Sequence, residues 1–453
     1  MHLRQKPAVS RSAFPEDGIY IGPEGSGSMR LLQMGSTGPA VQLLQLALNR
    51  AAFGELETDG LFGGATRSAL QRFQTAAGLV PDGVAGPLTH RALLPWYTGY
   101  VVHRIRPGDT FYSLARTYGT LPEHIATANP NLRPEALRVG SSLIVPLPFP
   151  VVPTRIDWCS ALVGYCIRGL CARYPFLRSG RIGQSVMGRP LWSLTLGTGE
   201  NRVLYNGCHH ANEWITTPLL LCWAEELAAA CAMGGALFDV EAAEILRYAS
   251  ICLVPALNPD GMDLVTGELS GGEFYRAARA IALRYPRFPF PDGWKANIQG
   301  IDLNLQYPAG WEQARENKFA QGIVSPAPAD YVGSAPLTAP EARAMYAFTL
   351  RYDPALVLAY HTQGEVIYWR FGDYEPPQGR ILAELFSQLS GYLVEDVPFV
   401  SGFAGYKDWF LQDFDRPGFT IEAGRGVNPL PLSAFPGIYE RNRGILTMAA
   451  LVT

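Results

Sequence analysis

Residues 202–216 read Arg-Val-Leu-Tyr-Asn-Gly-Cys-His-His-Ala-Asn-Glu-Trp-Ile-Thr and join an apolar, strand-like run to a turn that carries two histidines and an acid. His210 and Glu213 are three residues apart, so a turn entering a helix points both side chains to one side. A third candidate, His361, follows a second apolar run that ends at Tyr360. Two imidazoles and one carboxylate can hold a catalytic zinc ion and leave one position open. A lone histidine is more often a packing residue, however, and the spacing of His210 and Glu213 often arises by chance.

The segment around this motif, from about Thr154 to Thr453, alternates short apolar runs with helical stretches. Short continuous apolar strands between helices predict a sheet that is covered by helices on both faces. Ligands of such sheets gather at the carboxyl ends of the strands, and both halves of the histidine motif follow a predicted strand. We therefore expect one large α/β/α domain with its site at that edge.

Composition limits the class of partner. The chain has 453 residues and a net charge of −3, with 48% hydrophobic and 17% charged residues. A length like this predicts about two to four domains, and mixed charge argues against a nucleic acid or an anionic membrane as the partner. The longest apolar stretch, residues 217–233, contains Glu225 and Glu226, which predicts a buried helix and no membrane insertion. Seven cysteines without a CxxC pair predict reduced thiols.

The amino-terminal segment contains no apolar core of a secretory signal. Residues 1–28 are rich in Gly, Pro and Ser and predict a disordered leader, and Met29 is an alternative start.

Residues 29–97 predict a small helical bundle. Apolar residues recur at helical spacing, and the pairs Asp59-Gly60 and Asp82-Gly83 mark turns. The stretch Gly-Ser-Thr-Gly-Pro-Ala-Val-Gln-Leu-Leu-Gln at 35–45, followed by Asp-Gly-Leu-Phe-Gly at 59–63, resembles the peptidoglycan-binding domain of wall hydrolases. A purely structural helical module is the alternative.

Residues 100–147 predict the order strand, helix, helix, strand. With Pro107-Gly108-Asp109-Thr110 and Ala128-Asn129-Pro130-Asn131, this segment resembles a LysM domain, which implies binding of glycan strands that contain N-acetylglucosamine. A generic small α+β domain is the alternative. Four prolines in residues 146–153 predict a stiff, extended linker at 148–154, and the catalytic domain is expected at 155–453.

Three sequence motifs in this last segment resemble those of the zinc carboxypeptidase family. They are Gly-Cys-His-His-Ala-Asn-Glu-Trp-Ile-Thr at 207–216, Asn-Pro-Asp-Gly at 258–261 and Gly-Ile-Asp-Leu-Asn at 300–304. The resemblance implies a three-layer α/β/α sandwich with a mixed eight-stranded sheet. It also implies His210, Glu213 and His361 as ligands of Zn²⁺ and Glu422 as the general base and acid. Lys295 stands about where the family places an oxyanion-stabilising arginine; a surface lysine is the alternative.

Departures from the family pattern bear on the substrate. Many members carry an arginine after the Gly-x-Asp-x-Asn word that grips a free C-terminal carboxylate, whereas this chain has Leu305. The motifs at 302–312, 361–364 and 405–409 resemble the γ-D-glutamyl-meso-diaminopimelate peptidases of sporulating bacteria. With no secretory signal seen, this resemblance leads us to expect the protein in the cytoplasm of a sporulating cell, or associated with the cell wall after release. We therefore expect a zinc metallopeptidase that cuts peptidoglycan stem peptides, with the substrate-binding candidates Asn304, Tyr406, Lys407 and Arg425. The alternatives are a zinc carboxypeptidase for other peptides or amino-acid amides, and a non-catalytic wall-binding protein.

Overall fold

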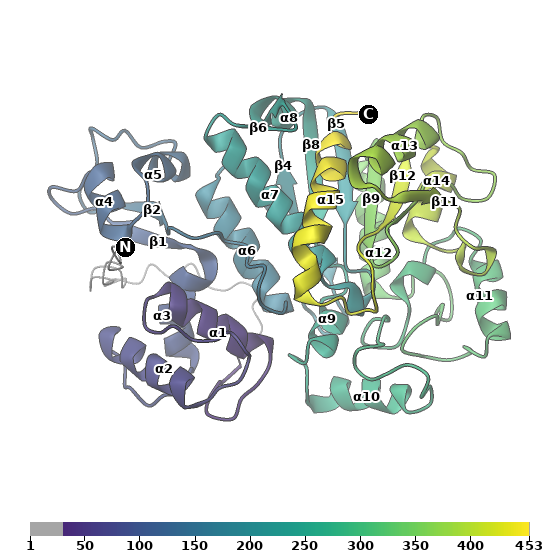
Figure 1. Cartoon of the computed structure of the whole chain (residues 1–453), viewed down its shortest axis with the longest axis horizontal. Helices are drawn as coiled ribbons and strands as arrows, with labels where there is room; N and C mark the ends of the chain where they lie inside the picture. The colour runs from purple at the N-terminus through teal and green to yellow at the C-terminus, as the bar shows by residue number, and fades with distance from the viewer. Residues whose placement is uncertain (1–29, 453) are drawn as a thin grey trace. The chain divides into compact units, whose positions relative to one another are not determined.

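The computed structural model describes residues 30–452, so the expected leader and the alternative start at Met29 lie outside the described residues. The chain divides into two compact units (Figure 1). The first contains the residues up to Ile156 together with Gly164–Leu177, and the second contains Asp157–Val163 and everything from Arg178 onward. Each unit is described by itself below.

The first unit begins with the predicted helical bundle, which is formed by α1 (Pro39–Arg50), α2 (Gly64–Ala76) and α3 (Pro87–Thr98). A buried glutamine in each of the first two helices fixes the loop that follows its helix. The Nε2 atom of each glutamine donates to an aspartate and a threonine, and its Oε1 atom accepts from the backbone N–H of the glycine after that aspartate. The two sets are Gln45, Asp59, Gly60 and Thr66, and Gln74, Asp82, Gly83 and Thr89. The two predicted Asp-Gly turns are therefore repeats of one hydrogen-bonded arrangement.

The predicted LysM segment has the expected order of elements: β1 (Tyr100–Arg104), α4 (Phe111–Tyr118), α5 (Pro122–Ala128) and β2 (Ser142–Pro146). The two strands pair antiparallel over their full length. Thr110 caps α4, because its side chain accepts from the backbone N–H of Ser113 while the Ser113 hydroxyl accepts in return.

The proline-rich segment, predicted as a stiff, extended linker, is partly buried: Pro148 and Pro150 are exposed, whereas Val151, Val152 and Pro153 are buried. Val151 and Val152 have at most 3% of their surface exposed. The guanidinium of Arg173, near the end of α6 (Ser160–Arg173), donates to the carbonyl oxygens of Gly99, Leu147 and Phe149 at 2.6–2.9 Å. These contacts join the end of the helical bundle, the end of β2 and the proline-rich segment to residues that lie later in the chain.

The second unit contains the expected mixed sheet of eight strands, in the order β11-β10-β12-β9-β5-β8-β4-β3. Strands β12, β9, β5 and β8 run parallel to one another in the middle of the sheet, and antiparallel strands border them on both sides. The strands span β3 (Arg178–Gln184), β4 (Pro190–Leu196), β5 (Asn201–Asn206), β8 (Ala249–Val254), β9 (Leu356–His361), β10 (Val366–Tyr368), β11 (Leu393–Glu395) and β12 (Gly418–Glu422).

Helices cover both faces of this sheet, so the second unit has three layers: helices, sheet, helices (Figure 1). On one face, Leu204 and Val357 pack with residues of α12 and α14; on the other, Tyr205 contacts Trp223 of α7 and donates to a carbonyl of α15. The short strands β6 (Ala236–Leu237) and β7 (Val240–Glu241) form a hairpin beside the sheet. The helices of this unit are α7 (Thr216–Ala232), α8 (Ala242–Tyr248), α9 (Pro259–Val265), α10 (Gly272–Ala282), α11 (Trp311–Ala320), α12 (Pro340–Tyr352), α13 (Gly379–Ser390), α14 (Tyr406–Phe414) and α15 (Phe435–Met448).

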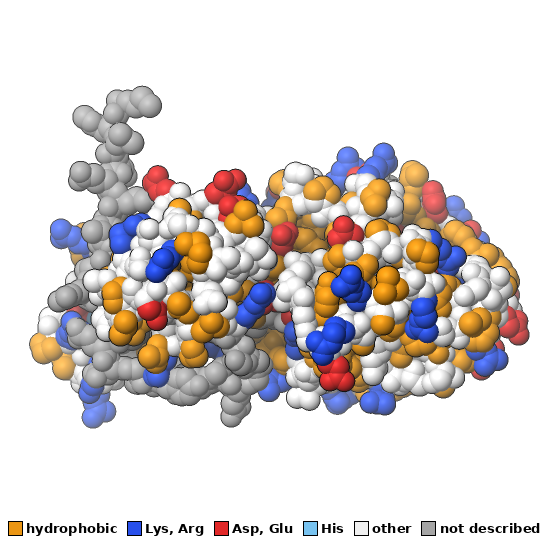
Figure 2. Space-filling model, turned by 90° about the horizontal axis from the view of Figure 1, so that it is seen from below, with side chains coloured by type: hydrophobic (Ala, Val, Ile, Leu, Met, Phe, Trp, Pro, Cys, Tyr) orange, Lys and Arg blue, Asp and Glu red, His pale blue; other side chains and the backbone are white. Residues whose placement is uncertain are grey.

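The stretch Ala211–Ala232, which includes α7, is long and apolar enough to cross a membrane, but most of it is buried inside the structure. On the face drawn in Figure 2, Lys and Arg side chains are scattered among hydrophobic and acidic ones and do not gather into one stripe. All seven cysteines are free thiols, as their spacing predicts.

Candidate active site

The candidate ligands come from two neighbouring parallel strands. His210 and Glu213 flank the short helix η2 (Ala211–Glu213), which follows β5, and His361 is the last residue of β9. Glu422 is the last residue of β12 and pairs with His361 in the sheet, so their side chains leave the sheet on the same face. The parallel strands therefore bring all four predicted residues to one edge, as the sequence predicts.

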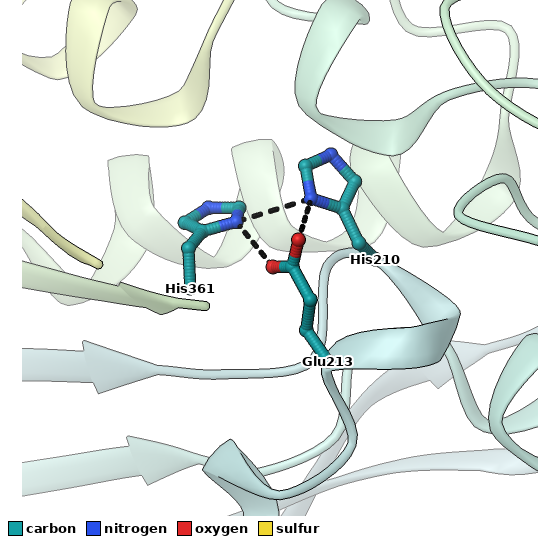
Figure 3. A group of neighbouring side chains, drawn as sticks. All are labelled: His210, Glu213 and His361. Carbon is teal, nitrogen blue, oxygen red and sulfur yellow. Dashed lines mark hydrogen bonds and ion pairs between the residues drawn. The ribbon is translucent and has the colours of Figure 1, made fainter. Parts of the chain in front are cut away.

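The three predicted ligands converge (Figure 3). Their ligand atoms all lie within 4.8 Å of one another. The Nδ1 atoms of the two histidines are 3.2 Å apart, and each lies about 3 Å from one carboxylate oxygen of Glu213. A tetrahedral zinc ion with bonds of about 2.0–2.1 Å holds its ligand atoms about 3.3 Å apart. The donor set and its spacing thus fit zinc.

The first ligand histidine has a supporting carboxylate. The Nε2 atom of His210 lies 3.1 Å from Oδ1 of Asp302, and the other oxygen of Asp302 accepts from the backbone N–H of Asp330. Asp330 in turn forms an ion pair of 2.7 Å with the buried Lys318 of α11. Such outer partners orient a ligating imidazole and raise its basicity.

The charge at the site favours a cation. Burial by itself would lower the pKa of His210, but the carboxylates of Glu213 and Asp302 outweigh that effect and raise the pKa to about 10. Burial raises the pKa of Glu422 above its ordinary value; His361 opposes this rise and Glu213 adds to it. A carboxyl group in this setting is suited to taking up and releasing a proton.

Lys295 lies against the same group, with its Nζ atom 3.2 Å from Oε1 of Glu213. Burial alone would lower the pKa of Lys295, but Glu213, Glu422 and Asp302 raise it, so the amine stays charged. Asn258 holds the local backbone in place, because its side-chain amide donates to the carbonyls of His209 and Ala296. The predicted oxyanion-stabilising lysine is therefore a cation at the site and not a free surface lysine.

Two of the predicted substrate contacts are wrong. Tyr406 is fully buried, and its hydroxyl bonds to the hydroxyl of Thr349 at 2.9 Å. Lys407 is 3% exposed; its Nζ atom pairs with Asp408 at 2.6 Å and donates to the carbonyl of Arg370. Both residues open α14, and the start of this helix packs into the core. Neither side chain can reach a substrate in this arrangement.

The other two substrate candidates stay predictions. Asn304 follows the Asp302 element and accepts a hydrogen bond from the backbone N–H of Tyr406. The side chain of Arg425 is 72% exposed and pairs with Glu365, whose backbone N–H donates to the carbonyl of Glu422. Arg425 therefore presents an accessible guanidinium next to the strand end that carries the predicted catalytic acid.

The sequence did not assign roles to two further residues of the site. Asp302 lies within the Gly-Ile-Asp-Leu-Asn word, so its position in that motif was an available signal. Asn428 donates to the carbonyl of Thr362 at 2.8 Å and lies 3.4 Å from Oε1 of Glu213. It stands in a loop after β12, where no local pattern distinguishes it.

Comparison with known families agrees with this geometry. Residues 165–396, just over half of the chain, match the model of the zinc carboxypeptidases. The chain belongs to the zinc carboxypeptidase family. It is a zinc metallopeptidase by this membership, although the match ends before Glu422. Residues 37–93 match the putative peptidoglycan binding domain and residues 103–146 match the LysM domain, which confirms both resemblances in the first unit.

Individual proteins are also similar to this chain. A protein named gamma-D-glutamyl-L-diamino acid endopeptidase 1 from Lysinibacillus sphaericus is 43% identical over 279 residues, which is 62% of this chain and 68% of the relative. The uncharacterized protein YqgT of Bacillus subtilis is 40% identical over 280 residues, or 61% of this chain and 72% of that protein. Among solved structures, thrombin activatable fibrinolysis inhibitor shares the fold, with a TM-score of 0.51 and 17% identity over 66% of this chain and 76% of its own.

Proposed function

We propose that this zinc metallopeptidase hydrolyses the amide bond between γ-D-glutamate and meso-diaminopimelate in peptidoglycan stem peptides. The observation that carries the proposal is that position 305 holds a leucine. Leu305 lies in an apolar cluster with Trp311, Val332 and Ala404, so no cation grips a C-terminal carboxylate from this position. The printed name of the relative from Lysinibacillus sphaericus supports the same bond class.

Each residue at the site has its own role in the proposed hydrolysis. Zinc held by His210, Glu213 and His361 supplies Lewis acidity and lowers the pKa of water. Glu422 accepts a proton from the attacking water and delivers it to the leaving amine of the diamino acid. Lys295 places a fixed positive charge near the developing oxyanion.

Arg425 supports recognition of the substrate. A γ-linked D-glutamate keeps a free α-carboxylate, and diaminopimelate adds further carboxylates close to the scissile amide. An exposed guanidinium can bind a carboxylate with two parallel hydrogen bonds. Its pairing with Glu365 holds the Arg425 side chain near the end of β12 without enclosing it.

The first unit supports the choice of polymer. It contains two modules whose families bind peptidoglycan or its glycan, and we assign the first unit to holding the wall or its fragments. This assignment predicts that the protein is retained by insoluble peptidoglycan even when catalysis is abolished.

The test compares two substrates on purified, zinc-loaded protein. L-Ala-γ-D-Glu-meso-diaminopimelate should be cleaved between its second and third residues, whereas a hippuryl peptide, which lacks the γ-linked D-glutamate and the diamino acid, should be cleaved poorly. Cleavage of the hippuryl peptide alone would contradict the proposed bond and favour an ordinary carboxypeptidase.

Two variants check the assigned roles. Glu422→Gln should keep one zinc ion per chain by metal analysis and lose about 10²–10⁴-fold in kcat, the usual contribution of general acid–base catalysis. Arg425→Ala should raise KM for the stem peptide more than it lowers kcat. Absence of bound zinc in the wild-type protein would support the alternative of a non-catalytic wall-binding protein.

A further inference from the structure

The sheet face behind the second ligand histidine carries an unusual polar residue. Asn206 is the last residue of β5 and pairs with Ala359 of β9. His361 lies two residues beyond Ala359, so it projects from the same face of the sheet. The neighbours of Asn206 on this face are apolar or aromatic, and they belong to the core cluster that includes Leu204, Val357, Tyr307 and Tyr406.

Three buried side chains on this face keep polar atoms without a protein partner among residues 30–452. They are Nε2 of His361, Nδ1 of His209, and both amide atoms of Asn206. All three residues are at most 1% exposed. The His209 ring lies 5.7 Å from the His361 ring, and its other nitrogen bonds to the hydroxyl of Tyr307 at 3.1 Å. The unpaired atoms of His209 and His361 therefore belong to neighbouring rings, and Asn206 projects from the same sheet face as His361 on the adjacent strand.

The two ligand histidines differ in their support. His210 has Asp302 on its outer nitrogen. His361 turns Nδ1 toward Glu213 and His210, so its Nε2 atom carries the ring proton when Nδ1 binds a metal. That N–H group needs an acceptor, because a buried donor without a partner costs free energy. A metal-bound histidine normally donates its outer N–H to a carboxylate, a carbonyl or a water.

The chemistry of the unpaired atoms matches a bound water. A buried water usually makes about three hydrogen bonds to polar groups that otherwise lack a partner. The Nε2–H group of His361 can donate to it, the Oδ1 atom of Asn206 can accept from it, and Nδ1 of His209 can take the third bond. The aromatic neighbours then exclude bulk solvent from the same space.

We propose that Asn206, His209 and His361 form a buried water-binding site, and that the bound water is the hydrogen-bond partner of the outer nitrogen of the zinc ligand His361. Asn206 is accordingly a positioning residue that acts through His361 and touches neither metal nor substrate. The site fixes which nitrogen of His361 carries the proton and how the ring is turned. The inference rests on the proposed zinc ligands but not on the choice of scissile bond.

The first test measures zinc affinity by chelator competition on the folded, full-length protein. Asn206→Leu should weaken zinc binding about tenfold, at the low end of what loss of an outer-shell partner costs. Asn206→Asp keeps an acceptor at the same place and should retain wild-type affinity even if the buried charge lowers the melting temperature. Unchanged zinc affinity in Asn206→Leu would overturn the proposal.

Thr447→Val is the matched control. Thr447 is fully buried on α15, against the other face of the sheet, and accepts a hydrogen bond from the Trp223 indole at 3.0 Å. This variant loses two side-chain hydrogen bonds in the same unit, from the Trp223 indole and to the carbonyl of Arg443, so it should lower stability and leave zinc affinity unchanged. A comparable loss of zinc affinity in Thr447→Val would mean that the Asn206→Leu effect is general destabilisation, and would overturn the proposal.

A second measurement does not depend on the variants folding. A high-resolution crystal structure of the zinc-loaded wild-type protein should show a water within hydrogen-bonding distance of Nε2 of His361 and the amide of Asn206. A dry site there would overturn the inference while leaving the proposed hydrolase activity intact. A protein that binds no zinc at all would instead sink the proposed function.

Discussion

Glu341→Gln should make the second unit more stable at pH 8 and leave it nearly unchanged at pH 4. Glu341 is fully buried in the first turn of α12, where its carboxylate accepts from the backbone N–H of Val186 and from Asn297. Burial raises the pKa of this carboxyl from 4.5 to about 7, despite the hydrogen bonds that oppose the rise.

The sign and size follow from proton linkage. Between pH 4.5 and 7 the folded protein binds the Glu341 proton more tightly than the unfolded chain does, so stability falls as pH rises through this window. A difference of about 2.5 pKa units corresponds to about 3 kcal/mol in the free energy of unfolding. Glutamine is neutral at every pH and does not incur this loss.

Urea unfolding followed by tryptophan fluorescence provides the measurement, because every tryptophan except Trp96 lies in the second unit. The midpoints of wild type and variant should nearly coincide at pH 4 and separate in favour of the variant at pH 8. A variant that is equally or less stable than wild type at pH 8 would refute the reasoning. So would a difference that does not change with pH.

Three further predictions follow from other contacts. Lys318→Met removes the partner of Asp330 and should weaken zinc binding several-fold, as measured by chelator competition. This loss is less than the 10–100-fold typical of a direct partner of a ligand, such as Asp302. Unchanged zinc affinity would show that the support of His210 ends at Asp302. Leu305→Arg should not create a carboxypeptidase. It should instead lower the free energy of unfolding by about 2–4 kcal/mol in thermal unfolding, because the charge enters an apolar cluster. A stable variant with new exopeptidase activity would disprove this. Gln45→Leu and Gln74→Leu should destabilise the first unit by similar amounts in calorimetry, about 2 kcal/mol each, because their hydrogen-bond sets match; markedly unequal losses would contradict the equivalence.

The ligand set was predicted from the resemblance to the zinc carboxypeptidases, and the positions of its members after predicted strands agreed with that prediction. Each parallel strand of an open sheet delivers its following residue to the same edge, so His210, Glu213 and His361 could be placed together without knowing the strand order. The register of β12 with β9 then brings Glu422 beside them. The fold class followed from the same alternation of short apolar runs and helices.

The failures arose where long-range packing decides burial. Tyr406 and Lys407 look like exposed polar candidates in sequence, but the first turn of α14 packs against the core, where Thr349 and Asp408 take up their polar atoms. Likewise, the prolines predicted a stiff, extended linker, yet Val151 within it is fully buried. No local pattern reports such contacts.

The pairing of Arg173 with the carbonyls of Gly99, Leu147 and Phe149 has a practical meaning for how this protein can be divided. A fragment that stops at the proline-rich segment would leave those carbonyls without their donor and strip Tyr97 of its stacked neighbour Tyr165. The peptidoglycan-binding and LysM domains therefore cannot be moved to another protein as residues 30–153 alone. A chimera that transplants them onto another hydrolase must carry residues 164–177 along with them.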